Sequence, residues 1–316
     1  MNLSFVVRNK MIKLNFYTND LMKGMNWKMT KKKKWVVIFL APGFLLFVFI
    51  FLISIVQLGI TSFTDWTIGT SPTFVGLKNY IYLFTEDEDF RKVIVNTLIW
   101  IVLQSTIHVC IGTTLALILR RKKWYTNFMR GVFMIPNIIS SAALGMLFLC
   151  IMNPQFGMVN NIVRAVTGTD FSQNWFLGAD TAFLTVTLTW LPYAGLVTIL
   201  VMAEMASISE DIYEAAKVDG ATDVQIDIKI VLPLMRNIIG TSTILAATSM
   251  LQKLDIIMMT TNGGPAGKTM NMPMYLYQTA LTDNNYGLAN AQGVILIVMG
   301  LVVVGVIRKI YRMDKE

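Results

Sequence analysis

Six long apolar blocks constrain the fold of this chain more than any other feature. Each is about 20 residues or longer, enough to cross a hydrocarbon core of about 30 Å as an α-helix. The blocks are continuous and lack the alternation of barrel strands, which favours helices over a β-barrel. The chain is 54% hydrophobic and 15% charged, whereas a soluble domain carries about 25% charged residues. We predict an all-α integral membrane protein with six transmembrane helices, at Trp35–Ile60, Val93–Leu119, Val132–Met152, Thr181–Ala203, Leu234–Met258 and Leu288–Ile307.

The first block is predicted to be a retained helix rather than a cleaved signal peptide. Residues 1–34 are too long for a signal-peptide n-region, the apolar run is too long for an h-region, and no A-x-A cleavage site follows. The predicted organisation is therefore a basic N-terminal segment (1–34), a six-span domain (35–312) that includes a polar connection (204–233), and a short tail (313–316).

Lysine and arginine concentrate in alternate connections between the spans. Residues 1–34 carry nine, 120–130 five, 204–236 three and 308–316 four. By the positive-inside rule these segments, and with them both termini, face the cytoplasm. The net charge of +8 is thus explained by topology and contact with anionic lipid, and no nucleic-acid partner is expected.

The sequence offers little for catalysis or metal binding. Cys110 and Cys150 fall inside predicted spans, where small apolar packing residues are expected rather than a disulfide or a metal pair. The single histidine, His108, lies in the middle of a span. A membrane-bound enzyme would need a catalytic cluster that this pattern does not provide, so no catalytic residue and no metal ligand is predicted.

The polar connection contains "SISEDIYEAAKVDGATDVQIDIKIVLP", Ser207 to Pro233. Ser207 and Glu210 have the spacing of a capping box at a helix start, and Gly220 is placed to end that helix in a left-handed conformation. Thr222 and Gln225 form a second box, and Pro233 is expected at the start of the fifth span. The pattern predicts two short helices hinged at Gly220, called the elbow below. So short a helix needs a supporting surface, and its acidic face favours a protein partner over anionic lipid.

The elbow resembles the EAA loop of bacterial binding-protein-dependent ABC importers. The matching residues are Glu214, Ala215, Ala216, Gly220, Ile230, Leu232 and Pro233, with Asp219 beside the glycine. "IPNIISSAALGMLF" (135–148), "LDIIMMTTNGGP" (254–265) and the stretch 275–296 are similar to the carbohydrate-importer branch with its MalF- and UgpA-type permeases. The resemblance covers nearly everything from Lys34 to the end.

This resemblance implies a type I importer permease in the bacterial cytoplasmic (inner) membrane. The elbow would be the coupling helix that sits in a groove of a cytoplasmic ATPase subunit. The expected partners are a homologous second permease subunit, two ABC ATPase subunits, an extracytoplasmic solute-binding protein, membrane lipid and a sugar, oligosaccharide or polysaccharide fragment. ATP and Mg²⁺ would bind the ATPase subunits, and this chain would bind no cofactor itself.

Six residues are candidates for the substrate path. Pro192 interrupts the fourth span between Trp190 and Tyr193, and broken helices often line a pathway, although packing geometry alone explains many such prolines. Gln252, Lys253 and Asp255 lie near the end of the fifth span, where the resemblance places part of the sugar site. Lys253 could instead snorkel to the interface while Asp255 caps or hydrogen-bonds locally; as a path residue it hints at an acidic saccharide.

Other polar residues inside spans are more often helix–helix hydrogen-bonding groups than ligand contacts. Among Gln104, His108, Asn137, Ser140 and Ser141, Asn137 is retained as the sixth path candidate.

The sequence also contains a near match to a nucleotide-binding motif and leaves one alternative function open. "NGGPAGKT" (262–269) nearly matches a P-loop, but Asn262 replaces the first glycine and the segment follows a membrane span, so ATP binding by this chain is rejected. An ion-coupled secondary transporter of a small polar solute is the alternative function. It predicts charged relays within the spans and gives the elbow no purpose.

Overall fold

The computed structural model describes residues 34–120 and 126–313. The basic segment 1–33, most of the basic run after Arg120 (121–125) and the last three residues lie outside the described part. The chain divides into two units, Met1–Leu58 and Gly59–Glu316, and each is described by itself.

The first predicted span is confirmed as one helix, Lys34–Thr61. It contains a π-helical segment, η1 (Val48–Leu52), which continues into α2 (Ile53–Thr61). Its large apolar side chains are exposed, with Phe39 at 78%. Such a surface calls for cover by hydrocarbon or by another apolar surface.

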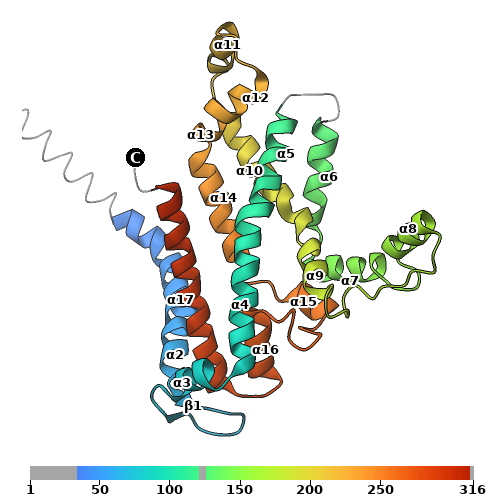
Figure 1. Cartoon of the computed structure of the whole chain (residues 1–316). Coiled ribbons are helices and arrows are strands. Elements are labelled where there is room, and N and C mark those ends of the chain that lie inside the picture. The colour runs from blue at the N-terminus through green and yellow to red at the C-terminus, as the bar shows by residue number, and fades with distance from the viewer. Residues whose placement is uncertain (1–33, 121–125, 314–316) are drawn as a thin grey trace, which may run out of the picture. The chain divides into compact units, whose positions relative to one another are not determined.

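The second unit is a helical bundle with a small β-hairpin. Long helices, among them α4, α5, α10, α14 and α17, run along its length, with α11 and α12 at one end and α3, β1 and α16 at the other (Figure 1). The elements are β1 (Thr64–Asp65), β2 (Thr73–Phe74), α3 (Lys78–Thr85), α4 (Glu88–Leu103), η2 (Gln104–His108), α5 (Val109–Leu119), α6 (Thr126–Ile138), α7 (Ser141–Ile151), α8 (Met158–Thr167), α9 (Ala182–Thr189), η3 (Leu191–Tyr193), α10 (Ala194–Met205), α11 (Glu210–Val218), α12 (Asp223–Ile226), η4 (Asp227–Val231), α13 (Leu232–Leu234), α14 (Arg236–Ser249), α15 (Asp255–Thr260), α16 (Met272–Leu281) and α17 (Tyr286–Tyr311).

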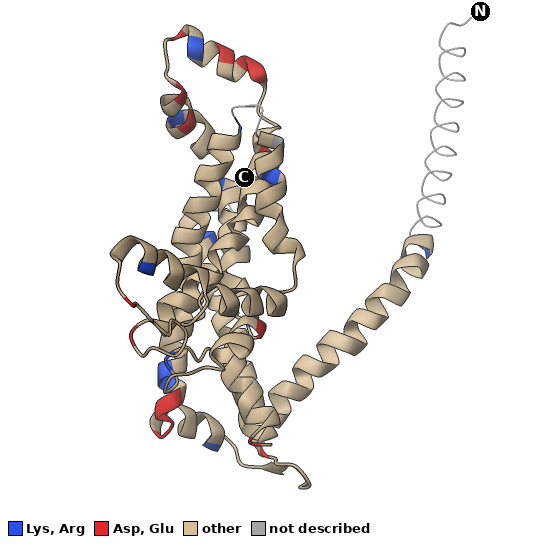
Figure 2. Ribbon diagram, turned by 90° about the vertical axis from the view of Figure 1, so that its right-hand side faces the viewer, with Lys and Arg blue, Asp and Glu red and all other residues tan. Residues whose placement is uncertain are grey.

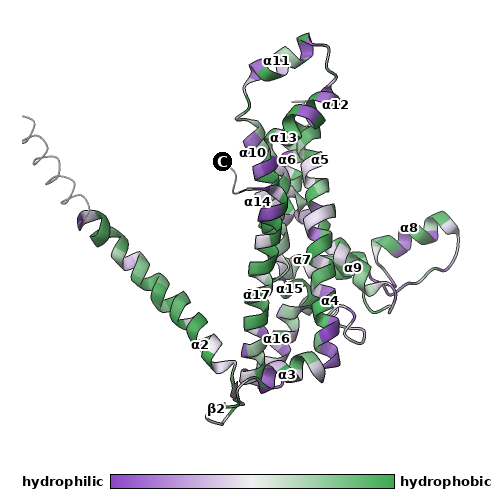
Figure 3. Cartoon of the chain, turned by 60° about the vertical axis from the view of Figure 1, so that its left-hand side comes forward, coloured by the Kyte–Doolittle hydropathy of each residue, from purple (hydrophilic) through white to green (hydrophobic). Residues whose placement is uncertain are grey.

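Charged and hydrophobic residues occupy different positions along the length of the bundle. Most charged residues lie toward the two ends of the bundle (Figure 2), and hydrophobic residues dominate the helices between them (Figure 3). Within the described residues, four helices are long and apolar enough to cross a membrane, or up to six if each of two bent pairs is one span. The second, fourth and sixth predicted spans are confirmed as Glu88–Leu119, Ala182–Met205 and Tyr286–Tyr311.

The third predicted span is wrong as a single straight helix. α6 and α7 are bent by 104° relative to each other. The break comes after Ile138 rather than at Pro136, which lies inside α6. Ser140 is extended (ψ 142°) and accepts a hydrogen bond from the Ala143 N–H, so it starts a new helix as an N-cap.

The fifth predicted span starts within two residues of its predicted start, Leu234, because α14 begins at Arg236, but its predicted end is wrong. The helical stretch Asp223–Leu234 contains Pro233 and bends by 71° into α14, so the proline lies just before the span, in α13. Because proline has no N–H and its ring crowds the preceding turn, the backbone before Pro233 adopts the π-helical segment η4. After the proline the chain turns at Met235 (ψ 4°). α14 then ends at Ser249, nine residues before the predicted end at Met258.

Glycines allow α10 to lie close to its neighbours. A Cβ on Gly195 would lie 1.9 Å from the Phe133 carbonyl oxygen of α6, and one on Gly112 of α5 would lie 2.6 Å from the Val197 Cβ. Small residues at such crossings let helices approach closely. α10 is therefore fixed between α5 and α6.

The two cysteines do not match the predicted packing role. Cys110 and Cys150 are free, as expected, but both are exposed rather than packed in the core of this chain.

Candidate functional site

The elbow forms as two short helices, with its start shifted from the predicted position. Ser209, not Ser207, is the N-cap of α11 and accepts from the Asp211 N–H at 3.3 Å. The predicted Ser207–Glu210 box is therefore wrong. Ser207 instead ends the preceding helix, because its hydroxyl donates to the Glu204 carbonyl at 2.7 Å.

The hinge at Gly220 is confirmed. Gly220 has φ +79°, its N–H donates to the Lys217 carbonyl at 3.0 Å, and the Ala221 N–H donates to the Ala216 carbonyl at 2.9 Å. These two bonds form a Schellman motif, which requires a left-handed residue at the glycine position.

The second capping box is also confirmed. The Gln225 N–H donates to the Thr222 hydroxyl at 3.3 Å, and the Gln225 side chain accepts from the Thr222 N–H at 2.8 Å. Local pairing thus sets the start of the second helix.

The two adjacent alanines of α11, Ala215 and Ala216, differ in exposure. Ala216 is 8% exposed and packs in one apolar cluster with Val201, Met205 and Ile226, against which Ile230 is also packed. Ala215 is exposed, as are the neighbours on its side of the helix: Ile212, Glu214, Val218 and Asp219. Of the coupling candidates at the end of the elbow, Leu232 is half-buried and Pro233 exposed.

Residues from four separate spans line a cavity of about 180 Å³ inside the bundle. Four of the six predicted path residues are among them: Asn137 of α6, Trp190 and Tyr193 around the Pro192 break, and Lys253. The break itself is confirmed as the 3₁₀ turn η3 between α9 and α10.

Gln252 and Asp255 do not line this cavity. Gln252 is exposed, and Asp255 accepts a hydrogen bond from the Ser141 hydroxyl, which joins α15 to α7. All three of Gln252, Lys253 and Asp255 follow the end of α14 at Ser249. The helical spacing of the predicted span therefore does not determine where their side chains lie. Gln104 and His108, not singled out as path residues from the sequence, do line the cavity; they lie in η2, where a π-helical turn is often found at a functional site.

Four buried polar atoms of the cavity lining have no hydrogen-bond partner within the described part of the chain. They are His108 Nδ1, Trp190 Nε1, the Tyr193 hydroxyl and the Ser242 hydroxyl. Leaving such a group unpaired costs about 1–3 kcal/mol each. The cavity therefore offers unsatisfied donors and acceptors to a polar ligand.

Lys253 contributes the one positive charge among the lining residues. Its ammonium lies 3.8 Å from the centroid of the Tyr193 ring, and among the ion pairs of the described residues none includes it. Lys253 is half-buried, so it does not reach out along the surface as a snorkelling lysine would.

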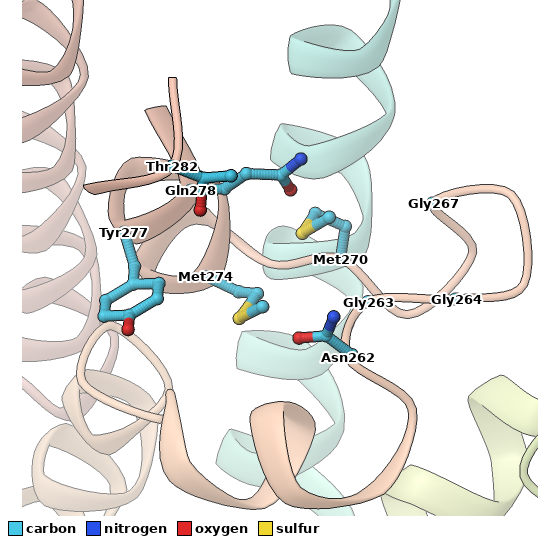
Figure 4. A pocket seen from close by; sticks show the side chains of 9 residues that line it. All are labelled: Asn262, Gly263, Gly264, Gly267, Met270, Met274, Tyr277, Gln278 and Thr282. Atoms are coloured by element: carbon cyan, nitrogen blue, oxygen red, sulfur yellow. The ribbon is translucent and has the colours of Figure 1, made fainter. Parts of the chain in front are cut away.

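A second cavity, of about 290 Å³, is lined by residues of α16 and of the segment between α15 and α16 (Figure 4). Asn262, Met270, Met274 and Gln278 line it, and none of the unpaired buried polar atoms found in the described residues belongs to it. Its polar lining residues therefore differ from those of the central cavity in that they include no unpaired buried atom among the described residues.

The P-loop-like segment runs beside this second cavity. It follows helix α15 rather than a strand, and the Thr269 hydroxyl is bonded to the Gly264 carbonyl at 2.6 Å. The Lys268 ammonium donates to the Ala179 carbonyl at 2.9 Å. This geometry differs from the strand–loop–helix context of a P-loop.

The family described as "Binding-protein-dependent transport system inner membrane component" matches residues 108–312. The chain belongs to this family. It is a multi-pass permease subunit of an ABC transporter that works with a solute-binding protein, and a transport component rather than an enzyme.

Individual relatives are similar over most of their length. The chain is 29% identical to the probable starch degradation products transport permease AmyD of Thermoanaerobacterium thermosulfurigenes, over 92% of this chain and 97% of the relative. It is 30% identical to the multiple sugar-binding transport permease MsmF of Streptococcus mutans, over 85% and 93%. A solved bacterial alginate ABC transporter, in complex with its alginate pentasaccharide-bound periplasmic protein, has the same fold: TM-score 0.80 at 22% identity, over 92% and 98%. The predicted importer-permease fold is confirmed.

Proposed function

We propose that the cargo of this permease is a saccharide and that it passes through the central cavity. The carrying observation is the set of four buried polar groups, unpaired within the described residues, in a cavity whose lining includes the aromatic residues Trp190 and Tyr193. Sugars present many hydroxyls, which can both donate and accept, and apolar C–H faces that pack on aromatic rings. The relatives AmyD and MsmF, named for starch products and multiple sugars, support the same class of cargo.

The cavity of one chain is too small for an oligosaccharide. Its volume of about 180 Å³ lies below the roughly 300–1,000 Å³ of ligand pockets. A homologous second permease subunit that completes the wall resolves this difference, and an extracytoplasmic binding protein delivers the saccharide.

Lys253 favours a carboxylate-bearing saccharide over a neutral one. Its ammonium lies against the Tyr193 ring, and it forms no ion pair with another described residue. A charge-assisted bond to a ligand carboxylate is stronger than this contact and is geometrically open to a flexible lysine.

The exposed face of α11 is the proposed docking surface for an ABC ATPase, two copies of which would carry ATP and Mg²⁺. Val218 is 87% exposed and Ile212 41%, and with Ala215 they form an apolar stripe flanked by Glu214 and Asp219. An apolar stripe exposed to water at a helix too short to be stable alone supports a protein partner. On this proposal the elbow lies on the cytoplasmic side, and the positive-inside pattern of the sequence assigns both termini to the same side.

Val218→Glu tests this docking surface, with Val166→Glu on α8 as the matched control because Val166 is similarly exposed, at 81%. We expect the Val218 variant to lose the co-purifying ATPase and saccharide-stimulated ATP hydrolysis, while the Val166 variant keeps the ATPase. Retention of the ATPase by the Val218 variant would refute the assignment.

A further inference from the structure

We infer that Arg120 is a positioning residue that ties the elbow to the helix whose π-helical turn lines the central cavity. This inference rests on the proposed coupling function. Arg120 directly follows α5, and its Nη2 lies 2.6 Å from Asp227 Oδ1 at the start of η4. Its guanidinium carbon also lies 4.7 Å from the centroid of the Tyr213 ring on α11. One side chain thus joins both helices of the elbow to a transmembrane helix.

The Arg120–Asp227 pair is the most buried of the ion pairs between described residues. Its side chains are 21% and 8% exposed, against 56% and 70% for Lys92–Asp89. An exposed pair contributes little because water and salt screen it. A short, partly desolvated bond from a planar guanidinium that also lies on a ring is far more restrictive in geometry.

The arginine connects to the cavity through a continuous helix. Glu88–Leu119 is one helix, and its η2 turn brings Gln104 and His108 to the cavity wall. Twelve residues separate His108 from Arg120, about 18 Å at 1.5 Å per residue. A displacement of α11 and η4 by a docked ATPase therefore pulls on the end of α5, and α5 carries the displacement to His108.

Apolar packing beneath the arginine supports the same connection. Ala116 of α5, Ala216 of α11 and Val231 of η4 belong to one buried cluster. Packing alone permits sliding, since apolar contact is non-directional. The bond between Arg120 and Asp227 is directional, so it passes a movement of the elbow on to α5.

The test measures coupling rather than stability. The complete transporter, with its ATPase and binding protein, is reconstituted, and saccharide-stimulated ATP hydrolysis is divided by hydrolysis without saccharide. Arg120→Gln removes the link but leaves Asp227 buried without this partner, so the double variant Arg120→Gln/Asp227→Asn is measured beside it. Tyr213→Phe keeps the ring and Tyr213→Leu removes it. Lys92→Gln breaks the exposed pair as the control.

We expect the double variant to keep its ATPase while the stimulation ratio falls by about tenfold, within the range of coupling changes seen for residues between two sites. Tyr213→Leu is expected to lower the ratio by a smaller factor, and Tyr213→Phe and Lys92→Gln to leave it near wild type. A double variant with the wild-type ratio would overturn the inference. A double variant that loses the ATPase together with the ratio would also overturn it, because the pair would then support docking only. Failure of the proposed function is distinguishable, because the wild-type complex would then show no saccharide stimulation at all.

Discussion

Replacing Gly220 by alanine isolates the contribution of the left-handed hinge. Gly220 has φ +79°, and a Cβ placed on it meets no atom within 4 Å. Alanine therefore adds no steric contact elsewhere and costs only backbone strain, about 1–2 kcal/mol. If the ATPase binds only the native elbow, that strain appears as a loss of affinity of about 5–30-fold. Titration of the ATPase onto the permease in lipid nanodiscs measures it, and Gly220→Asn should fall between alanine and wild type.

Gly168 provides the matched control. It follows α8, has φ +67° and likewise has open space around its Cβ position. Gly168→Ala introduces the same kind of strain away from the elbow, so the affinity for the ATPase should not change. Wild-type affinity in Gly220→Ala, or an equal loss in Gly168→Ala, would refute the reasoning.

Three other substitutions have defined outcomes. Gly195→Ala places a Cβ 1.9 Å from the Phe133 carbonyl oxygen and should abolish recovery of folded protein in detergent gel filtration; normal recovery with an unchanged Tm would contradict the close helix contact. Lys253→Met should reduce uptake of a carboxylate-bearing saccharide about 10–100-fold and spare a neutral one, and an equal effect on both would exclude an acidic cargo. Asp87→Ala removes the N-cap of α4 and the acceptor of the Tyr275 hydroxyl, 2.7 Å away. Burial, together with this hydrogen bond, raises the pKa of Tyr275. This variant should lower stability by about 1–3 kcal/mol, seen as a lower Tm, and an unchanged Tm would refute it.

Features set by short-range patterns were predictable from the sequence. The long apolar helices follow from hydropathy, and the Gly220 hinge and the Thr222–Gln225 box follow from residues within a few positions of each other. The Ser207 cap failed because Ser209 offers an equally good acceptor two residues later. The apolar composition of 132–152 does not distinguish a straight helix from one that Ser140 restarts.

Features that depend on contacts between residues far apart in the chain had weaker signals in the sequence. Polar and aromatic residues are costly within apolar spans, and this signal led to Asn137, Trp190, Tyr193 and Lys253, which line the central cavity. The positions of Gln252 and Asp255 depend on where α14 ends. The contact of Arg120 with Asp227 joins residues 107 positions apart, and no local pattern indicates it.

The most direct test of the central claim is saccharide uptake into liposomes that contain this permease, its second permease subunit and the ATPase. We predict uptake that requires ATP on the ATPase side and the binding protein on the other, and that is unaffected when ion gradients are collapsed. Uptake that proceeds without the ATPase and follows an ion gradient would contradict this account and establish the secondary transporter instead.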